Sequence, residues 1–241
     1  MKVIGCIPAR YGSTRLPAKP LAEISGKPLV LHVVERAVQA KKLHEVVVLT
    51  DDARIFEVVH KAGFKAVMTH PACRNGTERI IDYLAHSNGD VFVNMQGDEL
   101  LLNPTHVDQL VTEFTQAEYA MGTLGHWVSD EAVMRDPTTA KIVMDQAQNV
   151  LYFSRGVIPV QQNGQLPKNA LIQIGIYIYK RATLEKLAQL PPSPLEQIEQ
   201  LEQLRPLENN IPIHLTIVNH YEGFSIDTPR DLARACQLFG R

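Results

Sequence analysis

The stretch IPARYGSTRLPAKP, residues 7–20, decides the fold, because it begins at the last residue of the apolar run Val3 to Ile7. An apolar strand that ends in a glycine-containing loop and then leads into a helix is typical of a parallel α/β sheet. Such sheets bind ligands at the carboxyl ends of their strands. The loop offers backbone N–H groups around Gly12 to Thr14 and three long cations, Arg10, Arg15 and Lys19. One such cation alone would more often be a solvated surface charge, but three together favour a site for a polyanion such as a triphosphate.

Two familiar nucleotide-binding patterns are missing after this first strand. The sequence has neither the GxxxxGK[ST] pattern of P-loop NTPases nor the GxGxxG pattern of dinucleotide-dependent dehydrogenases. Each pattern uses glycines and a helix N-terminus to hold phosphates. The sequence therefore excludes these two classes, and the loop must hold its anion in another way.

The composition indicates a protein without a strong overall charge. The chain has 241 residues, 45% of them apolar, and a formal net charge of −2. This favours a single α/β domain spanning residues 1–241 and excludes a general attraction to nucleic acid or anionic membranes. Three cysteines without CxxC spacing argue against a disulfide framework and a zinc knuckle. With no signal-peptide or membrane-spanning pattern, we expect a cytoplasmic protein that neither binds nucleic acid nor inserts into a membrane.

Apolar runs alternate with amphipathic segments through the first half of the chain. The predicted strands are Val3 to Ile7, Val46 to Thr50, Ala66 to Met68 and Val91 to Met95, and the predicted helices are Leu29 to Ala40, Asp52 to Ala62, Thr77 to His86 and Thr105 to Gln116. This alternation predicts a mostly parallel central sheet covered by helices on both faces.

The rhythm changes in the second half. Further strands are predicted at Met121 to Trp127, Ala140 to Met144, Ile172 to Tyr179 and Ile213 to Val218, with an exposed loop at Pro159 to Asn169, a helix at Pro194 to Leu207 and a last helix starting at Asp227-Thr228-Pro229. Residues 121–179 are therefore interpreted as a small mixed-sheet insertion in a Rossmann-like α/β domain.

Two carboxylates are candidates for a magnesium site. Asp98 follows the apolar strand Val91 to Met95, which ends at the same sheet edge as the polyanion loop if the strands are parallel. Asp227 lies in a turn before the last helix, where an Asp is more often a helix N-cap than a ligand. Magnesium usually takes one or two carboxylates together with substrate phosphates. The residues alone leave a ligand role open for Asp98 and favour the helix N-cap for Asp227.

Nine short stretches occur in the order found in one known family. They are residues 7–17 (IPARYGSTRLP), 26–28 (GKP), 76–79 (GTER), 96–99 (QGDE), 151–155 (LYFSR), 175–177 (GIY), 193–196 (SPLE), 201–205 (LEQLR) and 227–229 (DTP). Together they resemble the 3-deoxy-manno-octulosonate cytidylyltransferases, the CMP-Kdo synthetases of bacterial lipopolysaccharide synthesis. The resemblance implies a nucleotidyltransferase that moves CMP from CTP to the anomeric hydroxyl of the sugar acid, with release of pyrophosphate and with Mg²⁺ as cofactor.

The resemblance also implies roles for individual residues. CTP would be bound by Ala9, Arg10, Gly12, Ser13, Arg15, Lys19, Gly76, Thr77, Arg79 and Gln96, and magnesium by Asp98 and Asp227. Arg10, Lys19, Asp98 and Asp227 would form the catalytic set. The sugar would be bound by Arg155, Gln173, Tyr177, Glu202 and Gln203. Without the resemblance, Tyr177 would be an ordinary strand aromatic, and Glu202 and Gln203 a solvated helix face.

Four positions depart from the family pattern. Gln173 stands where a His is usual, Asn75 where a Ser is usual, Leu100 where a Pro is usual and Ala18 where a Gly is usual. Gln donates and accepts hydrogen bonds but cannot become cationic near neutral pH. The change at Gln173 therefore opens the alternative of a modified acceptor, such as an 8-amino octulosonate or another acidic sugar.

Two further alternatives stay open. A nonulosonate could be the acceptor, and a catalytically silent nucleotide-binding protein could keep the same fold. The resemblance further implies a homodimer in which residues 121–179 supply much of the contact.

Overall fold

In the computed structural model, which describes residues 1–13, 15–117 and 119–240, the chain separates into two units. The first unit comprises Met1–Asp108 together with Glu222–Arg241, and the second comprises Gln109–Tyr221. Helix α4 (Pro104–Gln116) begins in the first unit and ends in the second. A single domain with an insertion at residues 121–179 stays a prediction; that segment belongs to the second unit.

Four parallel strands form the sheet of the first unit, in the order β6-β1-β4-β5. They are β1 (Val3–Ala9), β4 (Glu45–Thr50), β5 (Ala66–Met68) and β6 (Val91–Asn94). The apolar runs predicted as strands all form strands. Strands β1 and β6 are buried almost throughout, as expected for central strands that are covered on both faces.

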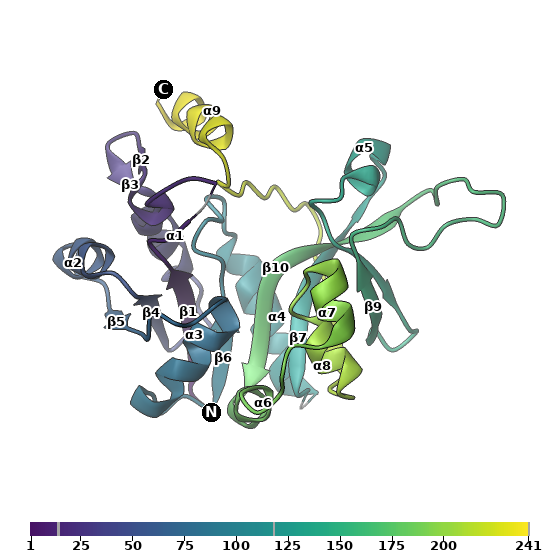
Figure 1. The fold of residues 1–241 in the computed structure, drawn as a ribbon, viewed down its shortest axis with the longest axis horizontal. Coiled ribbons are helices and arrows are strands. Elements are labelled where there is room, and N and C mark those ends of the chain that lie inside the picture. The colour runs from purple at the N-terminus through teal and green to yellow at the C-terminus, as the bar shows by residue number, and fades with distance from the viewer. Residues whose placement is uncertain (14, 118, 241) are drawn as a thin grey trace. The chain divides into compact units, whose positions relative to one another are not determined.

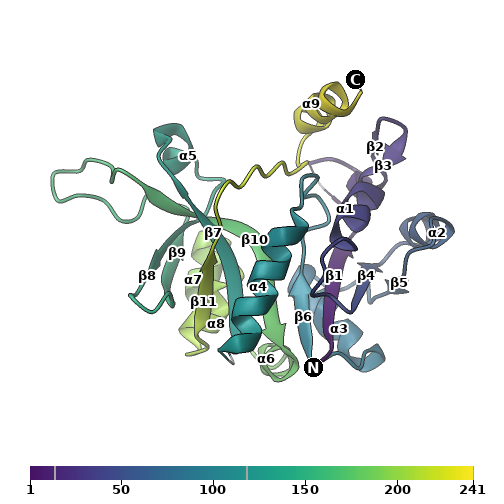
Figure 2. The same cartoon turned by 180° about the vertical axis from the view of Figure 1, so that it is seen from behind.

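Helices cover both faces of this sheet. The helices of the first unit are α1 (Leu29–Ala37), α2 (Ala53–Lys61), α3 (Gly76–Tyr83) and α9 (Pro229–Phe239), with short 3₁₀ turns at Lys19–Leu21 and Leu84–His86 and a small hairpin of β2 (Glu23–Ile24) and β3 (Lys27–Pro28). Helices α1 and α3 lie on opposite faces of β1, as the front and back views show (Figures 1 and 2). Opposite faces are expected, because the chain moves outward from β1 to β4 and β5 and then returns to β6.

The second unit contains a mixed sheet. Its strands are β7 (Met121–Val128), β8 (Lys141–Met144), β9 (Val150–Ser154), β10 (Ala170–Lys180) and β11 (Ile213–Ile217). Strand β10 is antiparallel to β7 and β8, β9 is antiparallel to β8, and β11 is parallel to β7. The prediction of a mostly parallel central sheet with a small region of mixed strands is confirmed.

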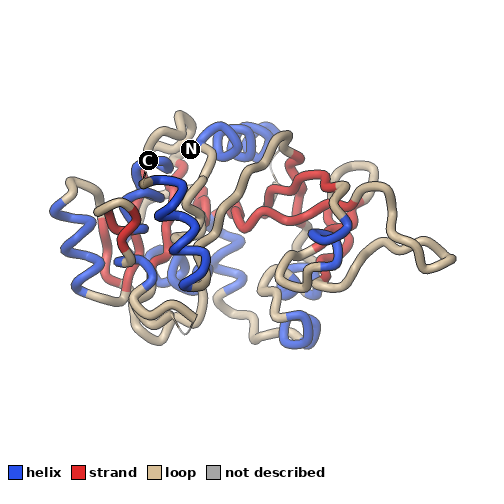
Figure 3. Tube along the Cα trace, turned by 90° about the horizontal axis from the view of Figure 1, so that it is seen from above, coloured by secondary structure: helices blue, strands red, loops and turns tan. Residues whose placement is uncertain are grey.

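Sequence reasoning missed or misplaced several elements of the second unit. Strand β9 and the helices α5 (Glu131–Arg135) and α6 (Arg181–Leu187) were not predicted. The helix predicted over Pro194 to Leu207 is wrong as one element, because it forms α7 (Pro194–Glu199) and α8 (Leu204–Glu208). Gln200 ends α7 in the left-handed conformation, with φ 54°. Residues 155–169 contain neither helix nor strand, which confirms the loop predicted there (Figure 3).

The surface of the second unit carries several large apolar side chains. Trp127 on β7 is 52% exposed, and Leu151, Val160 and Ile198 are also exposed. Among the described residues, no helix combines the length and the apolar character that crossing a bilayer requires.

Candidate functional site

A cavity of about 330 Å³ opens in the first unit where β1 and β6 end. Its lining residues are Pro8, Ala9, Arg10, Ser13, Arg15, Lys19, Pro20, Cys73, Arg74, Asn75, Gly76, Arg79, Gln96, Gly97, Asp98 and Asp227. All predicted CTP and metal residues except Gly12 and Thr77 are in this set. Thr14, whose backbone was expected to help hold the anion, lies outside the described residues.

Two carboxylates and two cations meet in this cavity. The Lys19 Nζ donates to Asp98 Oδ2 at 2.5 Å and to Asp227 Oδ1 at 3.0 Å. The Arg15 Nη2 donates to the same Asp227 oxygen at 2.9 Å. Burial by itself lowers the pKa of Lys19, but the Asp98 and Asp227 carboxylates outweigh this effect and raise it above its ordinary value. The ammonium therefore stays charged at neutral pH and offsets the repulsion between the two carboxylates.

The two carboxylates have the chemistry that a magnesium ion requires of its protein ligands. Asp98 and Asp227 supply hard carboxylate oxygens, and both lie within hydrogen-bond distance of a single cationic nitrogen. Within the described part of the chain, no group of three or more His, Cys, Asp or Glu side chains could hold a metal by itself. Two carboxylates with further ligands from substrate phosphates are the usual way to bind Mg²⁺, so the residues fit this ion.

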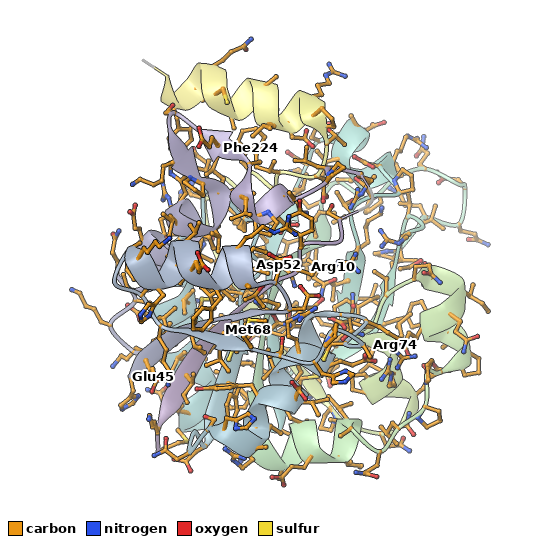
Figure 4. The ribbon with its side chains drawn as sticks, turned by 60° about the vertical axis from the view of Figure 1, so that its left-hand side comes forward. Arg10, Glu45, Asp52, Met68, Arg74 and Phe224 are labelled. Carbon is orange, nitrogen blue, oxygen red and sulfur yellow. The ribbon has the colours of Figure 1, made fainter. Side chains whose placement is uncertain are left out.

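The other two predicted arginines of the cavity differ sharply. Arg10 is exposed and has no hydrogen bond or ion pair with any described residue, so its guanidinium is free to meet an anion (Figure 4). Arg79 is only 2% exposed; it donates to Asp51 Oδ2 at 2.9 Å and to Thr69 Oγ1 at 2.6 Å. Arg79 thus ties α3 to the segments that follow β4 and β5.

The start of α3 forms one wall of the cavity. Asn75 caps the helix, its Oδ1 accepting from the Glu78 N–H at 2.8 Å, which explains why Asn can replace the usual Ser. A Cβ on Gly76 would lie 3.2 Å from the Pro8 ring, and one on Gly97 would lie 2.6 Å from the Pro8 carbonyl oxygen. These two glycines therefore let the start of α3 and the loop after β6 approach the end of β1.

Sequence reasoning did not assign a role to Arg74, which also lines the cavity (Figure 4). Its Nε and Nη2 donate to Glu78 Oε1 at 2.9 and 2.5 Å. Its position one residue before the helix cap, in a segment already assigned to CTP, is the signal that could have identified it.

A chain of hydrogen bonds links three predicted sugar residues in the second unit. The Gln203 side-chain amide donates to Gln173 Oε1 at 2.6 Å, and the Gln173 amide donates to the Tyr177 hydroxyl oxygen at 2.5 Å. Burial, together with the Glu202 carboxylate, raises the pKa of Tyr177 well above its usual range. The hydroxyl therefore stays protonated, and because its oxygen accepts from Gln173, its proton is available to another acceptor. Three of the five predicted sugar residues are thus hydrogen-bonded to one another, and Gln203 is buried rather than solvated. That they bind a sugar stays a prediction.

The Arg155 guanidinium is hydrogen-bonded to the backbone of the second unit. It donates to the carbonyl oxygens of Glu199 at 2.8 Å, Pro137 at 3.0 Å, Thr138 at 3.2 Å and Gln200 at 3.2 Å. The side chain thereby joins the end of α7 to the segment before β8. Its role in holding a sugar carboxylate stays a prediction.

A buried lysine, which sequence reasoning did not assign, supports Arg155. The Lys141 Nζ donates to the carbonyl oxygens of Arg155 and Asp136, each at 2.7 Å, and to that of Thr139 at 3.0 Å. Burial lowers the pKa of this lysine. A lone lysine in an otherwise apolar strand was the available signal.

Known proteins are similar to this chain in sequence and in fold. The family model described as cytidylyltransferase matches residues 4–215. The chain is 42% identical to the 3-deoxy-manno-octulosonate cytidylyltransferase of Desulfatibacillum aliphaticivorans, over 97% of each chain. It is 43% identical to the 8-amino-3,8-dideoxy-manno-octulosonate cytidylyltransferase of Shewanella pealeana, over 98% of each chain. The solved structure of a CMP:2-keto-3-deoxy-manno-octonic acid synthetase complexed with CTP superimposes with a TM-score of 0.94 at 38% identity, covering 100% of this chain and 99% of the other.

Proposed function

Because the chain belongs to the cytidylyltransferase family, we propose that it transfers CMP from CTP to the anomeric hydroxyl of 3-deoxy-manno-octulosonate, releasing pyrophosphate. The observation that carries this proposal is the cavity of the first unit, where the free guanidinium of Arg10 accompanies the cluster of Lys19, Asp98 and Asp227. The product would serve lipopolysaccharide synthesis.

In this reaction the anomeric oxygen attacks the α-phosphorus of CTP, and the bond from that phosphorus to the bridging oxygen breaks. Phosphoryl and nucleotidyl transfers depend mainly on positioning and on neutralisation of charge. Arg10, Arg15 and Lys19 would hold the triphosphate and stabilise the negative charge that collects on the departing pyrophosphate. The proton of the attacking hydroxyl would pass to solvent.

Magnesium would be held by Asp98 and Asp227, and when bound it would neutralise phosphate charge as a Lewis acid. Lys19 already holds both carboxylates in one place and counters their charge. Gly76, Arg79 and Gln96, which line the cavity, would lie around the cytidine together with Thr77. Here Arg79 would act by fixing the start of α3, since Asp51 and Thr69 already engage its guanidinium.

The acceptor sugar would be bound by residues of the second unit. Tyr177 offers a hydroxyl proton, Gln173 and Gln203 offer amide groups, and Glu202 offers a carboxylate for sugar hydroxyls. A homodimer formed through residues 121–179 and a location in the cytoplasm, where the protein would meet CTP, remain our predictions.

A second candidate acceptor is the 8-amino analogue of the same sugar. The relative from Shewanella pealeana is named for that analogue, and its identity to this chain equals that of the relative named for the unmodified sugar to within one per cent. Gln173 is neutral at every pH, and its side-chain oxygen accepts hydrogen bonds, so it tolerates an ammonium group that a cationic histidine would repel.

One assay tests the proposed function and separates the two acceptors. Pyrophosphate release would be measured with CTP and Mg²⁺ for 3-deoxy-manno-octulosonate, its 8-amino analogue and a nonulosonate, each repeated with excess EDTA. We expect release that depends on magnesium with at least one octulosonate and not with the nonulosonate. If no sugar acid gives release, the proposal is wrong and the silent nucleotide-binding alternative gains support. In Gln173→His, kcat/KM for the unmodified sugar should rise relative to kcat/KM for the 8-amino analogue. If the ratio of these two values is unchanged, Gln173 does not determine which acceptor is used.

A further inference from the structure

The two carboxylates of the candidate metal site come from distant parts of the sequence and are joined by a short antiparallel ladder. The Leu100 N–H donates to the Phe224 carbonyl oxygen at 3.0 Å, and the Ile226 N–H donates to the Asp98 carbonyl oxygen at 3.0 Å. Between these two bonds, Glu99 and Ser225 form an isolated β-bridge. The ladder thus places the residue before Asp227 directly against Asp98.

The Glu99 side chain reinforces this ladder from one side. It is only 6% exposed; its Oε1 accepts from the Phe224 N–H at 2.7 Å, and its Oε2 accepts from the Ser225 hydroxyl at 2.9 Å. Phe224 lies beside α9, where the Arg234 guanidinium stands 5.1 Å above its ring (Figure 4). Hydrogen bonds to a carboxylate are stronger than those between neutral groups, so this side chain is a strong link between the two segments.

The segment that carries Asp227 has little other regular structure. Between β11 and α9 the backbone forms no helix or strand apart from the bridge at Ser225. After that bridge, the Asp231 side chain accepts from the Asp227 and Thr228 N–H groups at 3.2 and 2.8 Å, which fixes Asp227 to α9. The contact of this segment with Asp98 depends on the ladder, on Glu99 and on the shared ammonium of Lys19.

We infer that Glu99 is a positioning residue that holds Asp227 beside Asp98 so that both carboxylates can engage one metal ion. This inference rests on the proposed function. Glu99 is not among the residues that line the cavity, so it acts through the two aspartates rather than through the nucleotide. Its removal should therefore weaken metal binding more than nucleotide binding.

The test measures metal binding without turnover. Mn²⁺ affinity would be measured by electron paramagnetic resonance in the presence of CTP and without a sugar acceptor, and CTP affinity would be measured separately in EDTA. In Glu99→Ala, which removes both hydrogen bonds to the segment that carries Asp227, we expect the dissociation constant for Mn²⁺ to rise about tenfold, while metal-free CTP binding changes less than about twofold. Glu222→Gln, which removes an exposed carboxylate from the same segment, is the matched control and should behave like wild type.

A milder variant covers the case in which Glu99→Ala folds poorly. Ser225→Ala removes only the hydroxyl that Glu99 binds and should raise the Mn²⁺ dissociation constant about threefold, with faster hydrogen exchange of the Phe224 and Ile226 amides. Wild-type Mn²⁺ affinity in Ser225→Ala, or in a folded Glu99→Ala, would overturn the inference. Equal losses of metal binding and metal-free CTP binding would also overturn it. If the wild-type protein binds no Mn²⁺ with CTP and releases no pyrophosphate, the proposed function itself fails.

Discussion

The cavity of the first unit and the hydrogen-bonded chain of the second unit use their polar groups in opposite ways. In the cavity, Arg10 has no partner among the described residues, and Lys19 is shared between two carboxylates that a metal ion could take over. In the second unit, the Arg155 guanidinium donates to four backbone carbonyl oxygens. The Gln173 side chain accepts a hydrogen bond from Gln203 and donates one to Tyr177. The first arrangement leaves charge available to a polyanion, whereas the second is a largely buried network in which the polar groups already bond to one another or to the backbone.

This difference teaches that residue type alone does not tell whether an arginine binds a ligand. Arg10, Arg79 and Arg155 all lie in motifs of the same family resemblance, yet of these three only the Arg10 guanidinium has no partner within the described part of the chain. Substitutions of these residues should therefore affect activity and stability in different proportions.

The largest expected effect comes from breaking the shared cation of the cavity. Lys19→Met should lower kcat/KM about 100-fold, because it removes one donor that stabilises the developing charge. It should also strengthen Mn²⁺ binding in the absence of CTP, because the two carboxylates lose their internal cation. Lys27→Met, which removes a half-exposed lysine of the same unit, is the control. Weaker Mn²⁺ binding without nucleotide would contradict this account of Lys19.

The same variant has a pH signature. The pKa of Lys19 is raised in the folded state, so its contribution to stability is fully present below the unfolded value of about 10.4 and is lost as pH rises through the folded pKa. The difference in free energy of unfolding between wild type and Lys19→Met should be constant from pH 7 to about 10 and shrink above it. Urea denaturation over this pH series checks the sign.

An intermediate effect sharpens the comparison of the two arginines. Arg155→Ala should lower the free energy of unfolding by about 2 kcal/mol, because it leaves four carbonyl oxygens without their charged donor. Arg10→Ala should change it by less than about 0.5 kcal/mol and raise the KM for CTP about tenfold instead. Urea denaturation and initial-rate kinetics on the same two variants measure both quantities. Equal losses of stability would erase the distinction drawn between the two sites.

The smallest effect concerns the helix start at the cavity wall. Asn75→Ala should cost about 1 kcal/mol by removing the cap of α3, whereas Asn75→Ser should cost less than about 0.5 kcal/mol. Thermal unfolding of the two variants distinguishes them. If Ser were as costly as Ala, the Asn75 side chain would have a role other than capping.

Local pattern was enough to predict the frame of the first unit. The apolar runs at Val3 to Ile7 and Val91 to Met95 carry their own strand signal, and parallel pairing then brings their carboxyl ends to one edge. That logic located the cavity and Asp98. From the residues alone Asp227 was the weaker candidate, because a turn before a helix has no periodic signal that specifies its distant partner, and the family resemblance strengthened its connection to this edge.

What local pattern could not predict depends on tertiary partners. The burial of Arg79 against Asp51, the carbonyl bonds of Arg155 and the pairing of Glu99 with Phe224 each join segments far apart in sequence. The break of the predicted helix at Gln200 is another such case, because a non-glycine residue with positive φ has no distinct sequence signal.

The exposed tryptophan on β7 gives the molecule a single intrinsic fluorescent probe, located in the second unit. Trp127 is the only tryptophan in the chain, so all indole emission arises from one strand of the second unit, and none arises from the nucleotide cavity. Because about half of the Trp127 side chain is exposed to solvent, a partner surface that covers this ring will shift its emission to shorter wavelength and reduce its quenching by iodide. The protein thus contains its own reporter of contacts made by residues 121–179, and that reporter is separate from the cavity in which CTP would bind.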